Sequence, residues 1–227
     1  MRTLALFAKQ PIPGQVKTRL AATWGAERAA GLFECFLRDQ FERFATEGDR
    51  RIVAYAPATS AAHDWFAESA GDWQLWPQPE TDLGRRMAAC FEQWCSAPSD
   101  RLLLIGSDSP NLPAGVFDQA FTLLESHDVV LGPSSDGGYW LVGLRGSASQ
   151  ARAIFDDIAW STAEVFLQTV ERVRSLKLKL GLLPLWFDVE TEAEVATLRG
   201  LLAADTEMRL RRTREFLTHS FDGIFPE

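Results

Sequence analysis

The chain has 227 residues, of which 46% are hydrophobic and 24% charged, and this is the composition of an ordinary globular protein with one sizeable core. Its formal net charge of −8 argues against a general nucleic-acid binder, which needs an excess of clustered cations. No apolar run approaches the ~20 residues that span a bilayer, and the three cysteines cannot all pair in disulfides, so we expect a cytoplasmic protein with no membrane span.

Short apolar runs alternate with helical patterns in the first half of the chain, which is typical of alternating β and α units. Helical spacing of apolar residues covers residues 26–45, and Thr81 or Asp82 is expected to cap a helix that continues through Trp94. The strands expected in this half cover residues 3–8, 51–56 and 73–76.

The same alternation continues in the second half. Strands are expected at 102–105, 128–131, 139–144 and 182–189. Helices are expected from Pro113 to about 126, and at 162–176, 192–203 and 206–218. Without an internal repeat or a convincing linker, the pattern predicts one α/β domain over residues 1–227, with a mostly parallel, buried sheet flanked by helices.

Four polar stretches follow or precede the expected strands, and they contain most of the candidate functional residues. They are residues 9–19, the Ser107-Asp108 pair, Asp136 and Asp188. Ligands of such sheets bind beyond the carboxyl ends of the strands. We therefore expect the four stretches to converge on one edge of the sheet.

The loop after the first expected strand, residues 8–20, carries three cations in an acidic protein. Gly14 allows backbone N–H groups to face a ligand, and Lys17 and Arg19 lead into a helix. Backbone donors, a helix amino terminus and two cations would together bind a diphosphate or triphosphate. A solvated, turn-rich loop is the alternative, and the spacing of Gly14 and Lys17 is not that of a P-loop.

Asp108 follows the most apolar strand, residues 102–105, in the stretch GSDSP. A carboxylate in this position either caps a turn or helix, or binds a hard metal ion such as Mg²⁺ or Mn²⁺. Asp188, in WFDVET, could supply a second carboxylate to the metal, or it could cap the helix that begins near Glu192.

Two further stretches indicate a ligand less specifically. The sequence DGGYW at 136–140 predicts a hairpin turn, or a backbone that lies close to a flat or sugar-like ligand. The sequence WST at 160–162 is expected to begin a helix. A helix cap is the preferred role for this stretch, and a ligand contact is the second. The three histidines lack the spacing of a zinc site or a serine hydrolase, and no Gly-x-Gly-x-x-Gly follows the first strand.

Five motifs, in their order and spacing, resemble those of a bacterial family of GT-A-like nucleotide-diphospho-sugar transferases, best known as the glycosyltransferases of arsenosugar-type gene clusters. The motifs read FAKQPIPGQVKTRL, GSDSPNLP, GPSSDGGYWLVGL, WST and FDVETEAEV. The opening is also similar to 2-phospholactate guanylyltransferase and, more distantly, to the molybdenum-cofactor guanylyltransferases. The resemblance extends from Leu4 to about Leu202 and implies a GT-A-like fold and a nucleotide-activated donor.

The resemblance also implies roles for individual residues. Asp108 would bind Mg²⁺ or Mn²⁺ in the position of the Asp-x-Asp motif of GT-A enzymes, and Asp188 would complete the metal site. The stretch here reads Ser107-Asp108-Ser109, so only one carboxylate of that motif is present. The residues of the nucleotide-phosphate loop would be Lys9, Gly14, Lys17 and Arg19. The residues on the sugar or acceptor side would be Asp136, Gly137, Gly138, Tyr139 and Trp160.

Two reactions fit these residues. In glycosyl transfer from a nucleoside-diphosphate sugar, the metal neutralises the departing diphosphate and Asp136 could deprotonate the acceptor hydroxyl of a small molecule. In nucleotidyl transfer to a phosphorylated small molecule, the metal with Lys17 or Arg19 would stabilise charge on the attacked α-phosphate. The resemblance favours sugar transfer narrowly, with nucleotidyl transfer as the alternative and a non-catalytic nucleotide or sugar-phosphate sensor as the third reading. The base, the sugar, the acceptor and the oligomeric state stay open.

Overall fold

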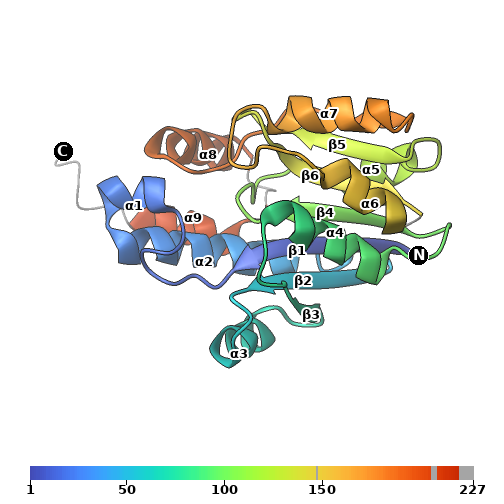
Figure 1. The fold of residues 1–227 in the computed structure, drawn as a ribbon. Helices are drawn as coiled ribbons and strands as arrows, with labels where there is room; N and C mark the ends of the chain where they lie inside the picture. Colours follow the sequence, from blue (N-terminus) through green and yellow to red (C-terminus); the bar gives the residue numbers. More distant parts are fainter. Residues whose placement is uncertain (147, 206–208, 220–227) are drawn as a thin grey trace.

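In a computed structural model, which describes residues 1–146, 148–205 and 209–219, seven strands form one sheet in the order β3-β2-β1-β4-β6-β5-β7 (Figure 1). The strands are β1 (Arg2–Lys9), β2 (Arg50–Ala56), β3 (Gln74–Pro77), β4 (Arg101–Gly106), β5 (Val129–Pro133), β6 (Tyr139–Arg145) and β7 (Leu180–Leu182). Strands β1 to β4 run parallel, β6 pairs antiparallel with β4 and β5, and β7 pairs parallel with β5. The predicted mostly parallel α/β sheet is therefore confirmed.

Helices cover both faces of this sheet. They are α1 (Thr18–Trp24), α2 (Ala26–Arg43), α3 (Ser60–Ser69), α4 (Leu83–Trp94), α5 (Val116–Leu123), α6 (Ala148–Phe155), α7 (Val165–Ser175), α8 (Glu192–Ala204) and α9 (Arg211–His219). One hydrophobic core joins the sheet to α4, α6 and α7, which lie on the near side in Figure 1. The other joins it to the remaining helices.

Alternation along the central strands divides their side chains between the two cores. In β1, Leu4 and Leu6 are buried in the core that contains α2, whereas Ala5 is buried in the core that contains α4. In β4, Leu103 packs toward α2 and Leu102 toward α4. Because both faces are covered, these strands are apolar at nearly every position, which explains their continuous hydrophobic runs.

Two predicted helix boundaries rest on capping contacts in the structure. The Asp82 side chain accepts a hydrogen bond from the backbone nitrogen of Arg85 at 2.9 Å. Asp82 is thus the N-cap of α4, which begins at Leu83. Thr191 and Glu194 form a capping box at the start of α8, with the Glu194 carboxylate 2.7 Å from the Thr191 nitrogen.

The prediction for residues 182–189 is wrong. Strand β7 ends at Leu182, and the following segment crosses the carboxyl edge of the sheet with one isolated bridge, between Ser134 and Trp186. Pro184 contributes to this outcome because it has no N–H group for a sheet ladder.

Other helix boundaries also differ. Helix α5 begins at Val116, after the turn that contains Pro113, and α7 begins at Val165, so that the WST stretch precedes the helix. Helices α3 and α6 are absent from the sequence prediction, and each is a short helix of ten residues or fewer. Residues 206–208 of the predicted last helix lie outside the described residues, and α9 begins at Arg211.

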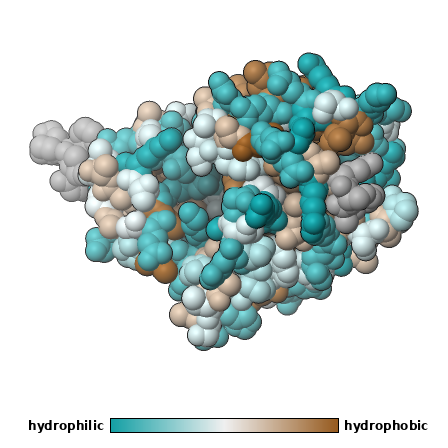
Figure 2. Space-filling view, viewed as in Figure 1, coloured by the Kyte–Doolittle hydropathy of each residue, from teal (hydrophilic) through white to brown (hydrophobic). Residues whose placement is uncertain are grey.

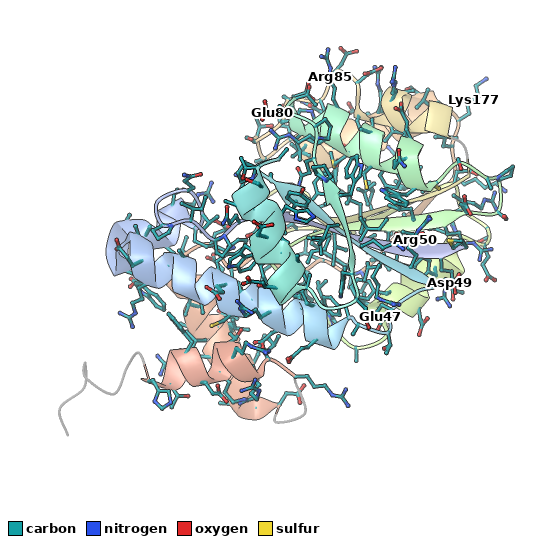
Figure 3. All side chains as sticks on the ribbon, turned by 90° about the horizontal axis from the view of Figure 1, so that it is seen from below. Glu47, Asp49, Arg50, Glu80, Arg85 and Lys177 are labelled. Atoms are coloured by element: carbon teal, nitrogen blue, oxygen red, sulfur yellow. The ribbon has the colours of Figure 1, made fainter. Side chains whose placement is uncertain are left out.

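The carboxyl ends of the parallel strands meet at one edge of the sheet, as predicted. The loops at this edge follow β1, β2, β3, β4 and β7, and the β5–β6 hairpin turn lies at the same edge because β6 runs in the opposite direction. Figure 3 shows Glu80 near the start of α4, at the carboxyl ends of the strands, and Asp49 and Arg50 at the opposite end of β2. All the polar motifs of the sequence therefore border one region.

The surface shown in Figure 2 is predominantly hydrophilic, with small and separate hydrophobic patches. Within the described part of the chain, no helix combines the length and the apolar character that crossing a membrane requires.

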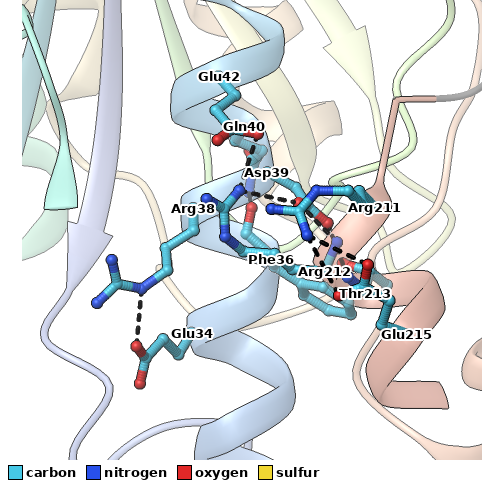
Figure 4. A network of polar contacts seen from close by, with 10 residues as sticks. All are labelled: Glu34, Phe36, Arg38, Asp39, Gln40, Glu42, Arg211, Arg212, Thr213 and Glu215. Carbon is cyan, nitrogen blue, oxygen red and sulfur yellow. Dashed lines mark hydrogen bonds and ion pairs between the residues drawn. The ribbon is translucent and has the colours of Figure 1, made fainter.

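A buried carboxylate of α2 fixes the start of α9 (Figure 4). Asp39 is 1% exposed, and it accepts hydrogen bonds from the backbone nitrogens of Arg212 at 3.1 Å and Thr213 at 2.8 Å. The Arg212 guanidinium also pairs with Glu42, one turn further along α2, at 2.8 Å. Asp39 thus supplies the capping acceptor that α9 would otherwise lack at its amino terminus.

We expect Asp39→Ala to lower the free energy of unfolding by about 2–3 kcal/mol, because one buried and one partly buried backbone donor lose their acceptor. Thermal unfolding should show a decrease of about 5–10 °C. The matched control is Glu34→Gln, which removes a partly exposed ion pair with Arg38 on the same helix and should cost about 0.5 kcal/mol or less. Equal losses in the two variants would contradict the proposed role of Asp39.

Candidate active site

Lys17 lies at the centre of the cluster of side chains at the carboxyl edge. It is the N-cap residue of α1 in the left-handed conformation, with φ of 47°, and its side chain is only 1% exposed. Its ammonium donates hydrogen bonds to Asp108 Oδ1 and, at 2.9 Å, to Glu190 Oε1. The ring of Phe33 lies 5.3 Å from the same nitrogen. The amine therefore points inward, away from solvent.

The charges around Lys17 keep it protonated. Burial alone would lower the pKa of Lys17, but Asp108 and Glu190 outweigh burial and raise the pKa above its ordinary value. Burial raises the pKa of Glu190, and the Lys17 ammonium partly offsets this effect. The side chains of Asp108 and Glu190 are 42% and 30% exposed, so each keeps a face that a ligand can reach.

Asp188 lies beside this group and is held by two hydroxyls. Ser109 donates to Asp188 Oδ1 at 2.5 Å, and Ser134 donates to Oδ2 at 2.9 Å. Burial raises the pKa of Asp188, and the charges of Asp108 and Asp136 add to this shift. The structure therefore brings the three candidate aspartates into one electrostatic environment.

The DGG stretch forms the predicted hairpin turn between β5 and β6. The Gly138 nitrogen donates to Asp136 Oδ1 at 2.9 Å, and the Gly138 oxygen accepts from the Ser134 nitrogen at 3.0 Å. Gly137 has φ of +89°, and a Cβ added there would lie 2.1 Å from the Ala163 oxygen. Glycine is thus required at 137 both by conformation and by the close approach of the segment before α7.

Two aromatic candidates for the sugar or acceptor side pack against helices. Tyr139 belongs to the core that contains α4 and α7, and burial raises the pKa of its hydroxyl. The Trp160 indole lies over Gly84, where an added Cβ would be 2.8 Å from the ring. It also lines a cavity of about 670 Å³ between α4 and α6.

The other predicted phosphate-binding residues lie at the surface of the loop after β1. Lys9 and Arg19 are exposed, and Gly14 is in the left-handed region with φ of +78°. Lys9 lines a cavity of about 230 Å³ at the ends of β1, β2 and β3. Gln78 and Arg86 line it too, and each donates a 2.6 Å hydrogen bond to a backbone oxygen. Hydrogen bonds to the backbone therefore hold two side chains of the cavity wall in place.

The carboxylates at this edge do not form a closed metal site by themselves. Within residues 1–146, 148–205 and 209–219, no group of three or more histidine, cysteine, aspartate or glutamate side chains has the arrangement of a metal centre. Magnesium usually takes one or two carboxylates and completes its shell with substrate phosphates and water. Asp108 and Asp188 carry carboxylate oxygens of the kind that such a partial site would use.

Sequence reasoning missed several residues of this cluster. Glu190 stands two residues after Asp188 in the sequence. In an extended segment, residues two apart point to the same side, and this spacing is the signal that could have identified Glu190. Ser109 and Ser134 flank the predicted aspartates, but nothing local shows that both hydroxyls reach Asp188. These partners depend on which loops meet at the edge.

The chain has the fold of the nucleotide-diphospho-sugar transferases. A crystal structure from Desulfovibrio desulfuricans G20, of a protein whose name assigns it to that class, matches with a TM-score of 0.82 and 31% sequence identity. The match covers 96% of this chain and 94% of that chain. A cytidylyltransferase from Leptospira borgpetersenii serovar Hardjo-bovis (strain JB197) shares the fold, with a TM-score of 0.60 and 11% identity over 96% of this chain and 94% of that chain.

The family described as "Uncharacterized protein conserved in bacteria" (DUF2064) matches residues 41–162, more than half of the chain, and this protein belongs to it. A curated relative, the 3-phospho-D-glycerate guanylyltransferase of Phenylobacterium zucineum (strain HLK1), is 31% identical over 137 residues. That match covers 57% of this chain and 61% of the relative, less than two thirds of its length. The resemblance inferred from the motifs is thus confirmed.

We expect Lys17→Met to lower the free energy of unfolding by about 2–4 kcal/mol at pH 7, because two carboxylates lose the ammonium that neutralises them. Without Lys17, burial and the charge of Asp108 still raise the pKa of Glu190 above that of the unfolded chain. The folded variant then binds a proton more tightly than the unfolded one, so its stability rises as the pH falls from 7 toward 5.

Urea unfolding of the wild type and Lys17→Met at pH 5 and pH 7 measures this dependence of stability on pH. The difference in stability between wild type and Lys17→Met should be smaller at pH 5. Lys179→Met, which changes an exposed lysine, should show little difference at either pH. If the loss of stability in Lys17→Met does not depend on pH, neutralisation of the two carboxylates by the ammonium is not what stabilises the protein.

Proposed function

We propose that this protein is a nucleotidyltransferase, which transfers a nucleotidyl group from a nucleoside triphosphate to a phosphorylated small molecule. The similarity to a guanylyltransferase, 31% identical over 137 residues, is the observation that carries the proposal. The shared fold with a cytidylyltransferase is consistent with it. The narrow preference for sugar transfer that the motifs indicate has weaker support.

The reaction we propose forms one bond to phosphorus and breaks another. A phosphate oxygen of the acceptor attacks the α-phosphorus of the triphosphate, the bond from that phosphorus to the bridging oxygen breaks, and pyrophosphate leaves. An ionised phosphate nucleophile needs no protein base. The exposed cations Lys9 and Arg19 would bind the departing phosphates, and Lys17 would hold Asp108 and Glu190 in place beside them.

The donor would enter at the cavity of about 230 Å³ beside Lys9. Its wall offers the carboxamides of Gln15 and Gln78 together with Arg86, and these are groups that can hydrogen-bond to a nucleobase. Gln10 and Gln15, from the loop after β1, also line the cavity, and the phosphates would lie along this loop. The acceptor would then approach from the side of Asp136, Gly137 and Gly138.

We include a divalent cation, Mg²⁺ or Mn²⁺, in the proposal. Asp108 and Asp188 would hold it, since both supply oxygen ligands and the charge of one already affects the pKa of the other. When bound, such an ion neutralises charge on the reacting phosphates. We also retain the predictions of a cytoplasmic location and of one domain over residues 1–227.

Glycosyl transfer is the second candidate, and the name of the Desulfovibrio desulfuricans G20 protein favours it. In that reaction the acceptor hydroxyl attacks the anomeric carbon, and a nucleoside diphosphate leaves. The exposed Asp136 would take the hydroxyl proton. The two candidates are separated by the leaving group, pyrophosphate or a nucleoside diphosphate.

The test is an assay of each nucleoside triphosphate with phosphorylated acids, 3-phospho-D-glycerate among them, in the presence of Mg²⁺ or Mn²⁺. We expect pyrophosphate release and a product whose mass equals acceptor plus nucleotidyl group. Asp108→Asn should lower kcat by about 100-fold or more. Asp118→Asn, an exposed aspartate paired with Arg2 at the other end of the sheet, is the matched control and should keep full activity.

Nucleoside-diphosphate sugars with simple acceptors form the second arm of the assay. Release of a nucleoside diphosphate from one of them, without pyrophosphate release from any triphosphate, would replace the proposal by glycosyl transfer. Binding without turnover in both arms would favour the sensor. Full activity of Asp108→Asn would contradict a role for this carboxylate in either reaction.

We expect Arg19→Gln to weaken binding of the nucleoside triphosphate about tenfold or more, because a hydrogen bond between charged groups is lost. Isothermal titration with a non-hydrolysable triphosphate and Mg²⁺ measures the dissociation constant. Arg38→Gln, which changes an arginine of α2 paired with Glu34, should bind the triphosphate as the wild type does. Unchanged affinity in Arg19→Gln would remove Arg19 from the phosphate site.

A further inference from the structure

We propose that Gln40, a buried residue of α2, is a positioning residue that sets the direction of the Asp108 carboxylate. Gln40 lies outside the five sequence motifs. The geometric part of the inference stands on the contacts of Gln40, and only its kinetic consequence rests on the proposed function.

Gln40 reaches from α2 to the loop that carries Asp108. Its side chain is 0% exposed, and its Nε2 donates to the Phe36 oxygen at 3.2 Å and to the Ser107 oxygen at 3.0 Å. The Ser107 carbonyl belongs to the peptide group directly before Asp108. Gln40 therefore fixes the plane of that peptide group.

The peptide group after Asp108 also accepts a hydrogen bond. The Val189 backbone nitrogen donates a hydrogen bond to the backbone oxygen of Asp108 at 2.9 Å. With both neighbouring peptide planes held, the backbone of Asp108 has little freedom to rotate, and its carboxylate is directed at Lys17. Gln40 and Val189 thus act as a pair on the two sides of one residue.

The rest of this loop is anchored to the same turn of α2. The Arg43 guanidinium donates to the Pro110 oxygen at 2.7 Å and to the Leu112 oxygen. The carboxamide of Asn111, although buried, has no hydrogen-bond partner among the described residues. The loop is thus held through its backbone carbonyls by α2, and a shift of the loop would leave those carbonyls buried and unpaired.

Stability alone does not explain a glutamine at this position. Its Oε1 is buried and has no partner among the described residues, which is a cost that a methionine of the same length would avoid. A glutamate would place an acceptor against two carbonyl oxygens, and a lysine would bury a charge. A carboxamide is the neutral side chain that reaches the Ser107 carbonyl with a donor.

The test is amide hydrogen exchange, followed by NMR, in wild type and Gln40→Met. If Gln40 holds the loop, exchange of the Val189 amide should become about tenfold faster in the variant. The reference is the Val195 amide, which donates to the oxygen of Thr191, the N-cap residue of α8, and should not change. The ratio of the two rates separates loosening of the Asp108 loop from a general loss of stability.

Trp73→Phe is the matched control. It removes another buried hydrogen bond to the α2 backbone, from Trp73 Nε1 to the Phe41 oxygen at 3.2 Å, without touching the Asp108 loop. The Val189 to Val195 ratio should stay at its wild-type value in this variant. An unchanged ratio in Gln40→Met, or the same change in Trp73→Phe, would overturn the inference.

The kinetic consequence is measured separately. In the transfer assay, Gln40→Met should lower kcat about tenfold while the KM of the triphosphate stays within about twofold, because the loop holds Asp108 and does not line the donor cavity. If no transfer is detected even in the wild type, the proposed function fails and the exchange ratio still tests Gln40. A KM effect with kcat unchanged would argue against positioning of Asp108.

The native protein provides a further measurement if Gln40→Met does not fold. The carboxamide protons of Gln40 should exchange far more slowly than those of an exposed glutamine, because one of them is held by the Ser107 carbonyl. Exchange at the rate of a free side chain would overturn the inference.

Discussion

The buried ammonium of Lys17 constrains the whole carboxyl edge of the sheet. An amine that is 1% exposed has to be neutralised where it lies, and the partners that do so, Asp108 and Glu190, come from the loops after β4 and β7. Lys17 itself follows β1. One charge therefore links three loops that are distant in the sequence. Because this charge is buried, separating the loops would leave it without a partner in the protein interior.

Helix α2 is the support on which this arrangement rests. It packs the ring of Phe33 beside the Lys17 ammonium, it contacts the loop of Asp108 through Gln40 and Arg43, and through Asp39 it fixes the start of α9. The same helix thus serves the core and the candidate site. A long, rigid element under a cluster of loops holds their polar groups in place more closely than the loops could hold one another.

The fold accommodates more than one transfer reaction, because its chemistry lies in the loops. The carboxyl edge provides exposed cations at Lys9 and Arg19, carboxylates at Asp108 and Asp188, and a glycine turn at 137–138. In the proposed reaction, these groups would bind a substrate with a chain of phosphates. Which bond breaks depends on the acceptor, and for this reason the proposal rests on the guanylyltransferase relative as well as on the geometry.

Local patterns in the sequence determined the first six strands, the Asp82 cap, the hairpin at Asp136 and the convergence of the polar motifs, because burial periodicity and turn chemistry act over a few residues. They misplaced the last strand, which ends at Leu182. They did not determine the inward direction of Lys17, or its contacts with Asp108 and Glu190, which are 91 and 173 residues away. Such contacts exist only after the sheet has brought the loops together. The tertiary structure therefore decided which charges pair among the residues that it describes.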